Sequence, residues 1–208
     1  MTALRLRRGH AAVVSAMLLQ AACGSVRYPQ LYVLEPRPPA PVVNHATSGA
    51  GPLIVRDFEC PSYLCDGRIV YRPTANEIGY YEYHRWAMSP RRMIADAVAT
   101  EIRSRALFSA VVLRDADPAA SYQLAGSIDR LEEVDRGRDV QVVCELTARL
   151  VDLRTHSIVW STSASSDRPV TDRSVAGVVA ALTSAMRETV DSLVESISTQ
   201  LAADALER

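Results

Sequence analysis

The stretch from Asp139 to Asp152 reads DVQVVCELTARLVD, in which apolar and polar residues alternate. Its apolar members on one face are Val140, Val142, Cys144, Leu146, Ala148 and Leu150. Successive side chains of a strand point to opposite faces of a sheet, so the alternation predicts a strand with one buried face and one wetter face. A further strand, 157–163, follows a turn at 153–156, and we expect the two strands to form a hairpin.

The segments around this hairpin predict an α/β protein. Ser89-Pro90 is an N-cap followed by proline at the first helical position, and it begins a predicted helix over about 90–107. A longer amphipathic helix is predicted from about Asp172, because apolar residues recur every three or four positions from Val175 to Leu201. Further strands are predicted at 30–34, 53–58, 68–72, 80–86, 110–113 and 122–131. This order predicts a single two-layer domain, a mixed β-sheet with two long helices packed on one face.

Composition and charge exclude some classes of protein. The chain has 208 residues, 48% hydrophobic and 23% charged, as in an ordinary globular protein. Its net charge is −1, from 23 basic residues that are all arginine and 24 acidic ones. A nucleic-acid partner is not expected, because nucleic-acid binding requires a basic excess.

The amino terminus has the layout of a signal peptide. Arg5, Arg7 and Arg8 precede an apolar stretch at 11–19, which is too short to cross about 30 Å of hydrocarbon as a helix. Ala21-Ala22-Cys23 then resembles the lipobox of bacterial lipoproteins, whose cysteine is lipidated and becomes the first residue. Gln20 departs from that pattern, where a leucine is usual, and an ordinary secretory signal with an incidental cysteine is the alternative.

These features divide the chain into a signal peptide at 1–22, a lipidated tether at 23–29 and a folded domain at 30–208, with a Pro/Gly loop at 36–52. Cleavage before Cys23 removes three arginines and no acids, so the net charge falls from −1 to −4. Membrane attachment then rests on the acyl chains, each buried CH₂ contributing about 0.8 kcal/mol. Residues 24–29 reach about 20 Å when extended. Gly24, in place of an aspartate, favours the periplasmic face of the outer membrane.

Three cysteines remain in an oxidising compartment after lipidation. Cys144 lies on the apolar face of its strand, which predicts a buried, inert thiol. Cys60 and Cys65 are too far apart in an extended chain to pair, but a turn at Pro61 permits it. We predict a Cys60–Cys65 disulfide, with two free thiols as the alternative.

The sequence contains no recognisable catalytic or metal-binding motif. G-x-S-x-G, G-x-x-x-x-G-K-[ST], H-E-x-x-H and C-x-x-C are absent, and the four histidines are scattered along the chain. Glu132-Glu133 resembles a carboxylate pair, but its position before Gly137 predicts a solvated hairpin tip. We therefore expect neither an enzyme nor a metal or cofactor.

Tyrosines concentrate in one part of the chain, since five of the eight fall between Tyr63 and Tyr83. In the predicted strand 80–86, strict alternation places Tyr81, Tyr83 and Arg85 on one face. Tyr80, Glu82, His84 and Trp86 then share the other. Whichever set is exposed is a candidate partner surface, because aromatic and arginine side chains are enriched at interfaces. The alternative is that these side chains only stabilise the sheet through cross-strand pairs.

Several segments together resemble the ABC-type transport auxiliary lipoproteins, the family that includes the paraquat-inducible C-type lipoproteins. The segments are Leu31-Tyr32-Val33-Leu34-Glu35-Pro36, Pro61-Ser62-Tyr63-Leu64, Ile69-Val70-Tyr71-Arg72, Asn76-Glu77 and Tyr83-His84-Arg85-Trp86-Ala87. The sequence departs from the family pattern in the two cysteines that flank 61–64 and at Met88-Ser89-Pro90.

The resemblance implies a non-enzymatic accessory to an ABC system with mammalian-cell-entry domain proteins, which moves lipids between two membranes. Its implied partners are the mammalian-cell-entry protein, the ABC transporter subunits and the membrane, through acyl chains on Cys23. A homo-oligomer is left open. The competing interpretations are a periplasmic enzyme and an outer-membrane lipoprotein that activates a cell-wall synthase.

Overall fold

The computed structural model describes residues 27–36, 38, 50–114 and 119–206. The predicted signal peptide, Cys23 and most of the predicted Pro/Gly loop lie outside the described residues. The elements in chain order are β1 (Gln30–Tyr32), β2 (Leu53–Val55), α2 (Ser62–Cys65), β3 (Arg68–Thr74), β4 (Glu77–Trp86), α3 (Pro90–Ser104), β5 (Val111–Leu113), β6 (Tyr122–Arg136), β7 (Asp139–Asp152), β8 (Ser157–Pro169) and α4 (Val175–Leu206).

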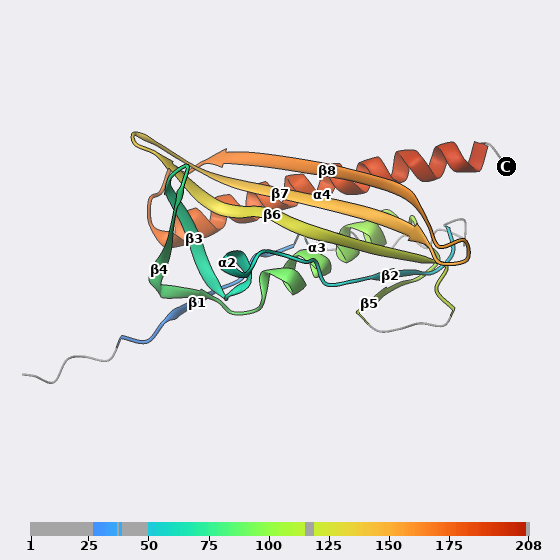
Figure 1. Cartoon of the computed structure of the whole chain (residues 1–208), viewed down its shortest axis with the longest axis horizontal. Coiled ribbons are helices and arrows are strands. Elements are labelled where there is room, and N and C mark those ends of the chain that lie inside the picture. The colour runs from blue at the N-terminus through green and yellow to red at the C-terminus, as the bar shows by residue number, and fades with distance from the viewer. Residues whose placement is uncertain (1–26, 37, 39–49, 115–118, 207–208) are drawn as a thin grey trace, which may run out of the picture.

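Three long strands, β6, β7 and β8, form an antiparallel meander that extends along the whole molecule (Figure 1). β7 has the predicted bounds, and its predicted hairpin with β8 is confirmed. Arg136 pairs with Asp139 across the β6–β7 turn, where Gly137 has a φ of 83°, a conformation that glycine adopts without strain. β8 is longer than predicted, because pairing with β7 continues to Pro169 through serines that carry no strand signal of their own.

β2 and β3 pair in parallel with the other edge of β6, so the sheet is mixed, as predicted. β2 lies parallel to the start of β6, with Leu53 opposite Tyr122, and β3 lies parallel to its end, with Tyr71 opposite Glu133. β5 pairs with β2, while β4 and then β1 continue outward from β3. β6 is therefore the strand that joins two separate groups of short strands.

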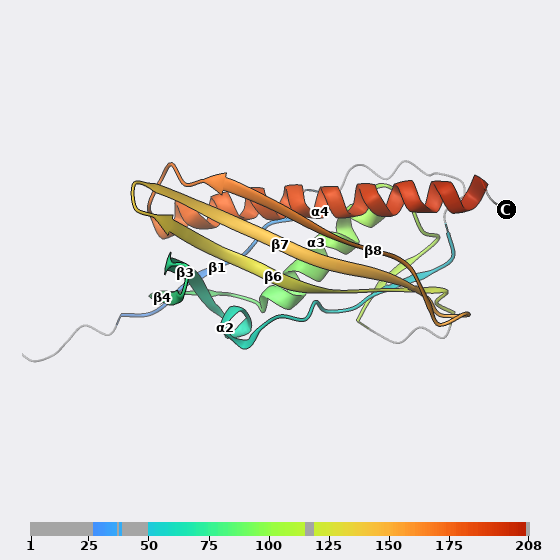
Figure 2. The same cartoon turned by 45° about the horizontal axis from the view of Figure 1, so that its top comes forward.

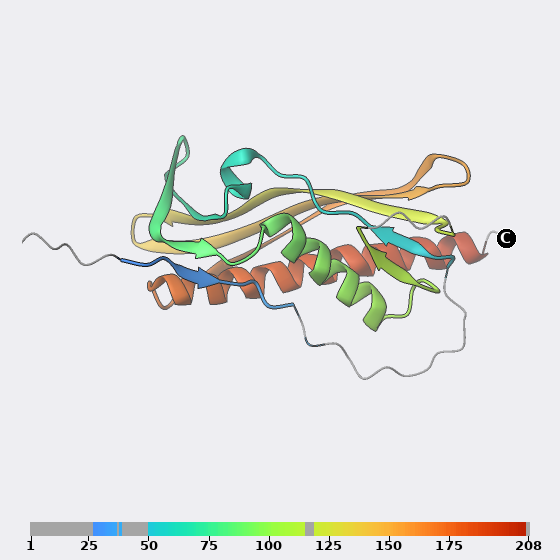
Figure 3. The ribbon, with the colours of Figure 1, turned by 90° about the horizontal axis from the view of Figure 1, so that it is seen from below.

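The two long helices cover one face of the sheet, which confirms the predicted two-layer arrangement. α4 packs across β7 and β8, and α3 lies beside α4 on the same face (Figures 2 and 3). Leu182 and Met186 of α4 are fully buried with Leu146 and Leu150 of β7, in one continuous core. In the described part of the chain, no helix is long and apolar enough to cross a membrane.

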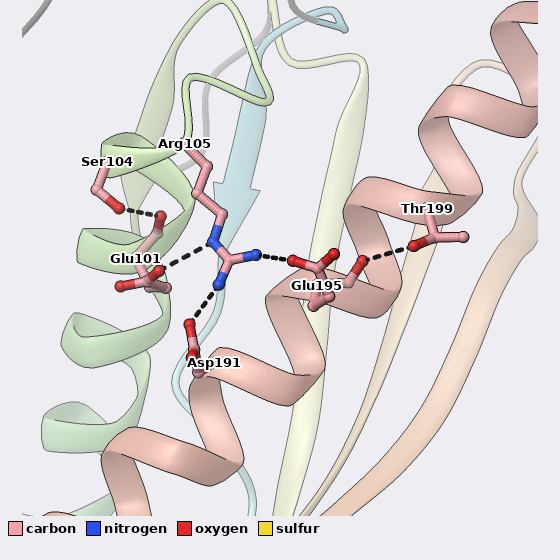
Figure 4. Close-up of polar contacts among 6 residues, drawn as sticks. All are labelled: Glu101, Ser104, Arg105, Asp191, Glu195 and Thr199. Carbon is pink, nitrogen blue, oxygen red and sulfur yellow. Dashed lines mark hydrogen bonds and ion pairs between the residues drawn. The ribbon is translucent and has the colours of Figure 1, made fainter.

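Arg105 fastens α3 to α4 at the end of the shorter helix (Figure 4). Its Nε donates to Glu101 one turn earlier at 2.9 Å, and its two terminal nitrogens donate to Asp191 and Glu195 of α4. A single exposed ion pair contributes at most about 1 kcal/mol, but three carboxylates around one partly shielded guanidinium form a network with one favoured geometry. The network fixes the position of α3 along α4.

One helix was not predicted from the sequence. α2 is a single turn between Cys60 and Cys65, in which the amides of Leu64 and Cys65 donate to the Pro61 carbonyl. Four residues are too few to show a helical period, although Leu64 is buried in the core. The predicted helix boundaries were too generous, since α3 ends at Ser104 and α4 begins at Val175.

Candidate partner-binding edge

β1 and β4 form an outer edge of the sheet, at the end of the molecule where the described chain begins (Figure 1). β1 runs parallel to β4, with Leu31 opposite Arg85 and Tyr32 opposite Trp86. Among the described strands, β1 pairs with β4 alone, so its other edge has free backbone groups that another chain can pair with.

This edge carries most of the exposed large apolar side chains of the described residues. We name Tyr28, Leu31, Val33, Tyr83 and Met88 the β1–β4 edge surface. Tyr28 is 82% exposed, Leu31 65% and Tyr83 39%. Exposed apolar groups that gather on one face mark interaction sites more often than scattered ones do. The β1–β4 edge surface is therefore the candidate functional site.

The six residues of β4 singled out from the sequence have different environments. Tyr83 is exposed and stacks under the Arg27 guanidinium, 5.7 Å from its ring centre. Trp86 is buried in the core, and Arg85 is half-buried beside β1. Tyr80, Tyr81 and His84 are also half-buried. Only Tyr83 of the six is thus clearly available to a partner.

The half-buried members of β4 are occupied by contacts within the domain. The Tyr81 ring lies 5.2 Å from Tyr71 and 6.0 Å from His84, and its hydroxyl donates to Glu133. His84 also shares a hydrogen bond of 3.1 Å with the Tyr32 hydroxyl. Tyr80 packs beneath Arg68, with the guanidinium 3.8 Å from the ring centre. These contacts connect β1, β3, β4 and β6.

The prediction that β4 alternates strictly between two faces was wrong. Tyr81 and His84 were expected on opposite faces, yet their rings are in contact. The cause is a bulge, because the two-residue step from Arg68 to Val70 on β3 lies opposite the five-residue step from Tyr80 to Arg85 on β4. Extra residues in one strand of a pair reset which side chains point outward.

The prediction of a solvated tip at Glu132-Glu133 was also wrong. Pairing with β7 and β3 extends β6 to Arg136, so both glutamates lie inside the sheet and are buried. The Glu132 carboxylate accepts two hydrogen bonds of 3.0 Å from Arg72 and one of 2.8 Å from Arg130. Burial raises the pKa of the Glu133 carboxyl, and the hydrogen bond from Tyr81 partly offsets this effect. These carboxylates hold strands together within the sheet.

The structure places two of the three described cysteines next to each other and the third in the core. α2 supplies the turn that brings Cys60 and Cys65 into a disulfide, with Cα atoms 6.1 Å apart. Cys144 is a free thiol, fully buried on the core face of β7. Burial raises the pKa of Cys144 to about 12, so the thiol stays protonated and unreactive. Among the described residues, no group of three or more His, Cys, Asp or Glu side chains is placed to hold a metal ion.

The disulfide predicts one accessible thiol in the denatured, unreduced protein. Intact-mass analysis after alkylation should show a single modified cysteine, Cys144, besides the lipidated residue, and three after reduction. Three modified cysteines without reduction would contradict the bond. Replacing Cys60 with serine should lower the free energy of unfolding by about 2 kcal/mol, because the closed loop is short.

The exposed residues in and directly after β1 were not predicted from the sequence. Leu31 and Val33 are exposed while Leu34 is buried, which is the alternation expected of a strand. That pattern was visible in the sequence. What it did not reveal is that β1 is an edge strand, because edge position depends on the pairing of all the other strands.

Comparison with known proteins identifies the family. A protein from Xanthomonas campestris of solved structure is 24% identical, with a TM-score of 0.72 over 85% of this chain and 99% of that one. A second, uncharacterised protein is 13% identical, with a TM-score of 0.65 over 82% of this chain and 99% of that one. At these identities the similarity shows the fold. No curated protein matches the chain in sequence. Residues 32–194 match the ABC-type transport auxiliary lipoprotein component family, and the chain therefore belongs to that family.

Proposed function

We propose that this protein is a non-enzymatic accessory of an ABC and mammalian-cell-entry system that moves lipids between membranes. In this proposal acyl chains on Cys23 anchor it at the periplasmic face of the outer membrane, and the β1–β4 edge surface binds the mammalian-cell-entry protein. Membership of a transport auxiliary family supports the general role. The observation that carries the proposal is the exposed, apolar edge directly after the anchor sequence.

The position of this edge relative to Cys23 supports its role. Only residues 24–26 lie between Cys23 and Arg27, the first described residue, and the four steps from Cys23 to Arg27 span at most about 14 Å. The edge surface is therefore held close to the membrane, where subunits of an envelope transporter assemble. With a mature charge of −4, the domain has no general attraction for anionic surfaces. Recognition must then come from local apolar contacts and from pairing with the free edge of β1.

Alanine substitution of two edge residues should weaken the complex without unfolding the domain. We expect the Leu31→Ala, Tyr83→Ala double variant to recover at least tenfold less mammalian-cell-entry protein of its own operon in co-purification from membranes. A tenfold loss corresponds to about 1.4 kcal/mol, which is modest for two interface side chains. Truncation of exposed side chains costs little stability, so the melting temperature should hardly change.

Two further variants serve as controls for this experiment. Ile158 of β8 is 61% exposed at a different edge of the sheet, so Ile158→Ala is a matched control that should leave co-purification unchanged. Trp86→Ala removes a core aromatic side chain and should lower the free energy of unfolding by about 3 to 5 kcal/mol. It serves as the control for loss of co-purification through misfolding. Unchanged co-purification of the double variant would place the partner surface elsewhere. Absence of any co-purification, or recovery of a cell-wall synthase instead, would contradict the transport proposal.

A further inference from the structure

A second surface feature lies away from the β1–β4 edge, on the sheet face opposite α4. Gln123, Ala125 and Ser127 of β6 alternate with the core residues Leu124 and Ile128 and so point to that face. They border an open groove of about 550 Å³, completed by β7, β8, the chain after β2 and β5, and the first turn of α3. The volume is within the range of small-molecule sites.

The groove is positively charged, although the chain as a whole is not. Four arginines line it, Arg56, Arg91, Arg114 and Arg149, against the two carboxylates of Asp57 and Glu59. Arg114 is committed to ion pairs with Asp57, at 2.8 Å, and Asp96. The other three arginines face Glu59, and the Asp129 carboxylate borders the groove, where it accepts hydrogen bonds from the Ser127 and Thr147 hydroxyls at 2.7 and 2.6 Å. Among the described residues, three arginines against these two carboxylates leave one net positive charge in the groove.

These three guanidinium groups keep donors free for a ligand. Arg56 donates one terminal nitrogen to the Arg114 carbonyl at 2.7 Å, and Arg91 donates its Nε to the Phe58 carbonyl at 3.0 Å. Each bond to the backbone orients the side chain, and no other described residue takes up its remaining N–H groups. Arg149 is exposed and makes no hydrogen bond or ion pair with the described residues. A guanidinium presents its N–H donors in a planar fork that matches two oxygens of a phosphate.

The rest of the lining selects a hydrophilic ligand. Among the described residues that line it, only Ala125, Gly126 and Ala148 are apolar, and hydroxyl groups of Ser127, Thr147 and Ser161 lie among them. An acyl chain would find little apolar surface to bury here. We propose that the groove binds a phosphate ester through Arg56, Arg91 and Arg149. Two sources share this chemistry, the headgroup of a phospholipid and a small free phosphate. The site does not depend on the partner-binding edge.

Calorimetric titration of the purified full-length, lipidated protein in non-ionic detergent tests the site. Inorganic phosphate, glycerol phosphate and short-chain phosphatidylglycerol are the probes, with glycerol as the uncharged control. We expect saturable binding of glycerol phosphate that Arg149→Gln weakens at least tenfold. The melting temperature of this variant should stay the same, because Arg149 has no partner in the described structure.

Arg136→Gln is the matched control, since it removes the same charge at the exposed β6–β7 turn. Arg136 lies eleven residues along β6 from Ala125, or about 36 Å at 3.3 Å per residue. Phosphatidylglycerol binding more tightly than inorganic phosphate would support a headgroup, and equal binding would support a free phosphate. The proposal is overturned if no phosphate probe binds saturably, or if Arg149→Gln and Arg136→Gln have the same effect.

Discussion

Replacing Arg72 with methionine should lower the free energy of unfolding by about 3 kcal/mol. The Glu132 carboxylate has an exposed fraction of 0% and receives two of its three hydrogen bonds from Arg72. Removing one partner of a buried ion pair typically costs about 3 to 5 kcal/mol, because a desolvated charge is left uncompensated. Arg130 remains 2.8 Å from Glu132, so we expect the lower end of this range.

Denaturant unfolding of three variants checks this result. Arg168→Met breaks an ion pair with Glu188 in which both side chains are more than 40% exposed, and should cost less than about 1 kcal/mol. The Arg72→Met, Glu132→Leu double variant should recover most of the lost stability, because it buries no unpaired charge. If Arg72→Met lowers the free energy of unfolding no more than Arg168→Met does, the buried Glu132 carboxylate does not need Arg72 for its stability.

Replacing Cys23 with serine should release the protein from membranes completely. Cys23 lies outside the described residues, and Ala21-Ala22-Cys23 resembles a lipobox. With no spanning helix among the described residues and a mature charge of −4, acyl chains are the proposed attachment. Fractionation and palmitate labelling should show a soluble, unlabelled variant. A Cys60→Ser, Cys65→Ser variant should keep both label and membrane attachment. Labelled, membrane-bound Cys23→Ser protein would refute the anchor.

The sequence predicted those elements whose own residues carry the signal. β7 alternates over its whole length, and α4 repeats every three or four residues, so both were recognised. The ends of β6 and β8 were not, because neighbouring strands extend them through polar residues such as Glu132 and Ser166. The β4 bulge follows from the fit between β3 and β4, which no local pattern records.

The candidate sites were predictable to different degrees. Tyr83 was named from the aromatic segment, and the family resemblance was confirmed. The arginine groove gave no signal, because Arg56, Arg91 and Arg149 are far apart in sequence and follow no spacing motif. The pairing of β2, β6 and β7 brings Arg56 and Arg149 to one groove, and the start of α3 adds Arg91.

The central position of β6 has a consequence for the order of folding. β2 and β3 both need β6 as a partner, yet their residues precede their β6 partners by about 60 to 70 positions in the chain. Contacts distant in sequence form late, because closing a long loop costs entropy before any contact is gained. The amino-terminal strands therefore remain incompletely paired until residues 122–136 are available. From there on, β7, β8 and α4 each meet a partner that has just emerged, so assembly proceeds from the carboxyl-terminal half.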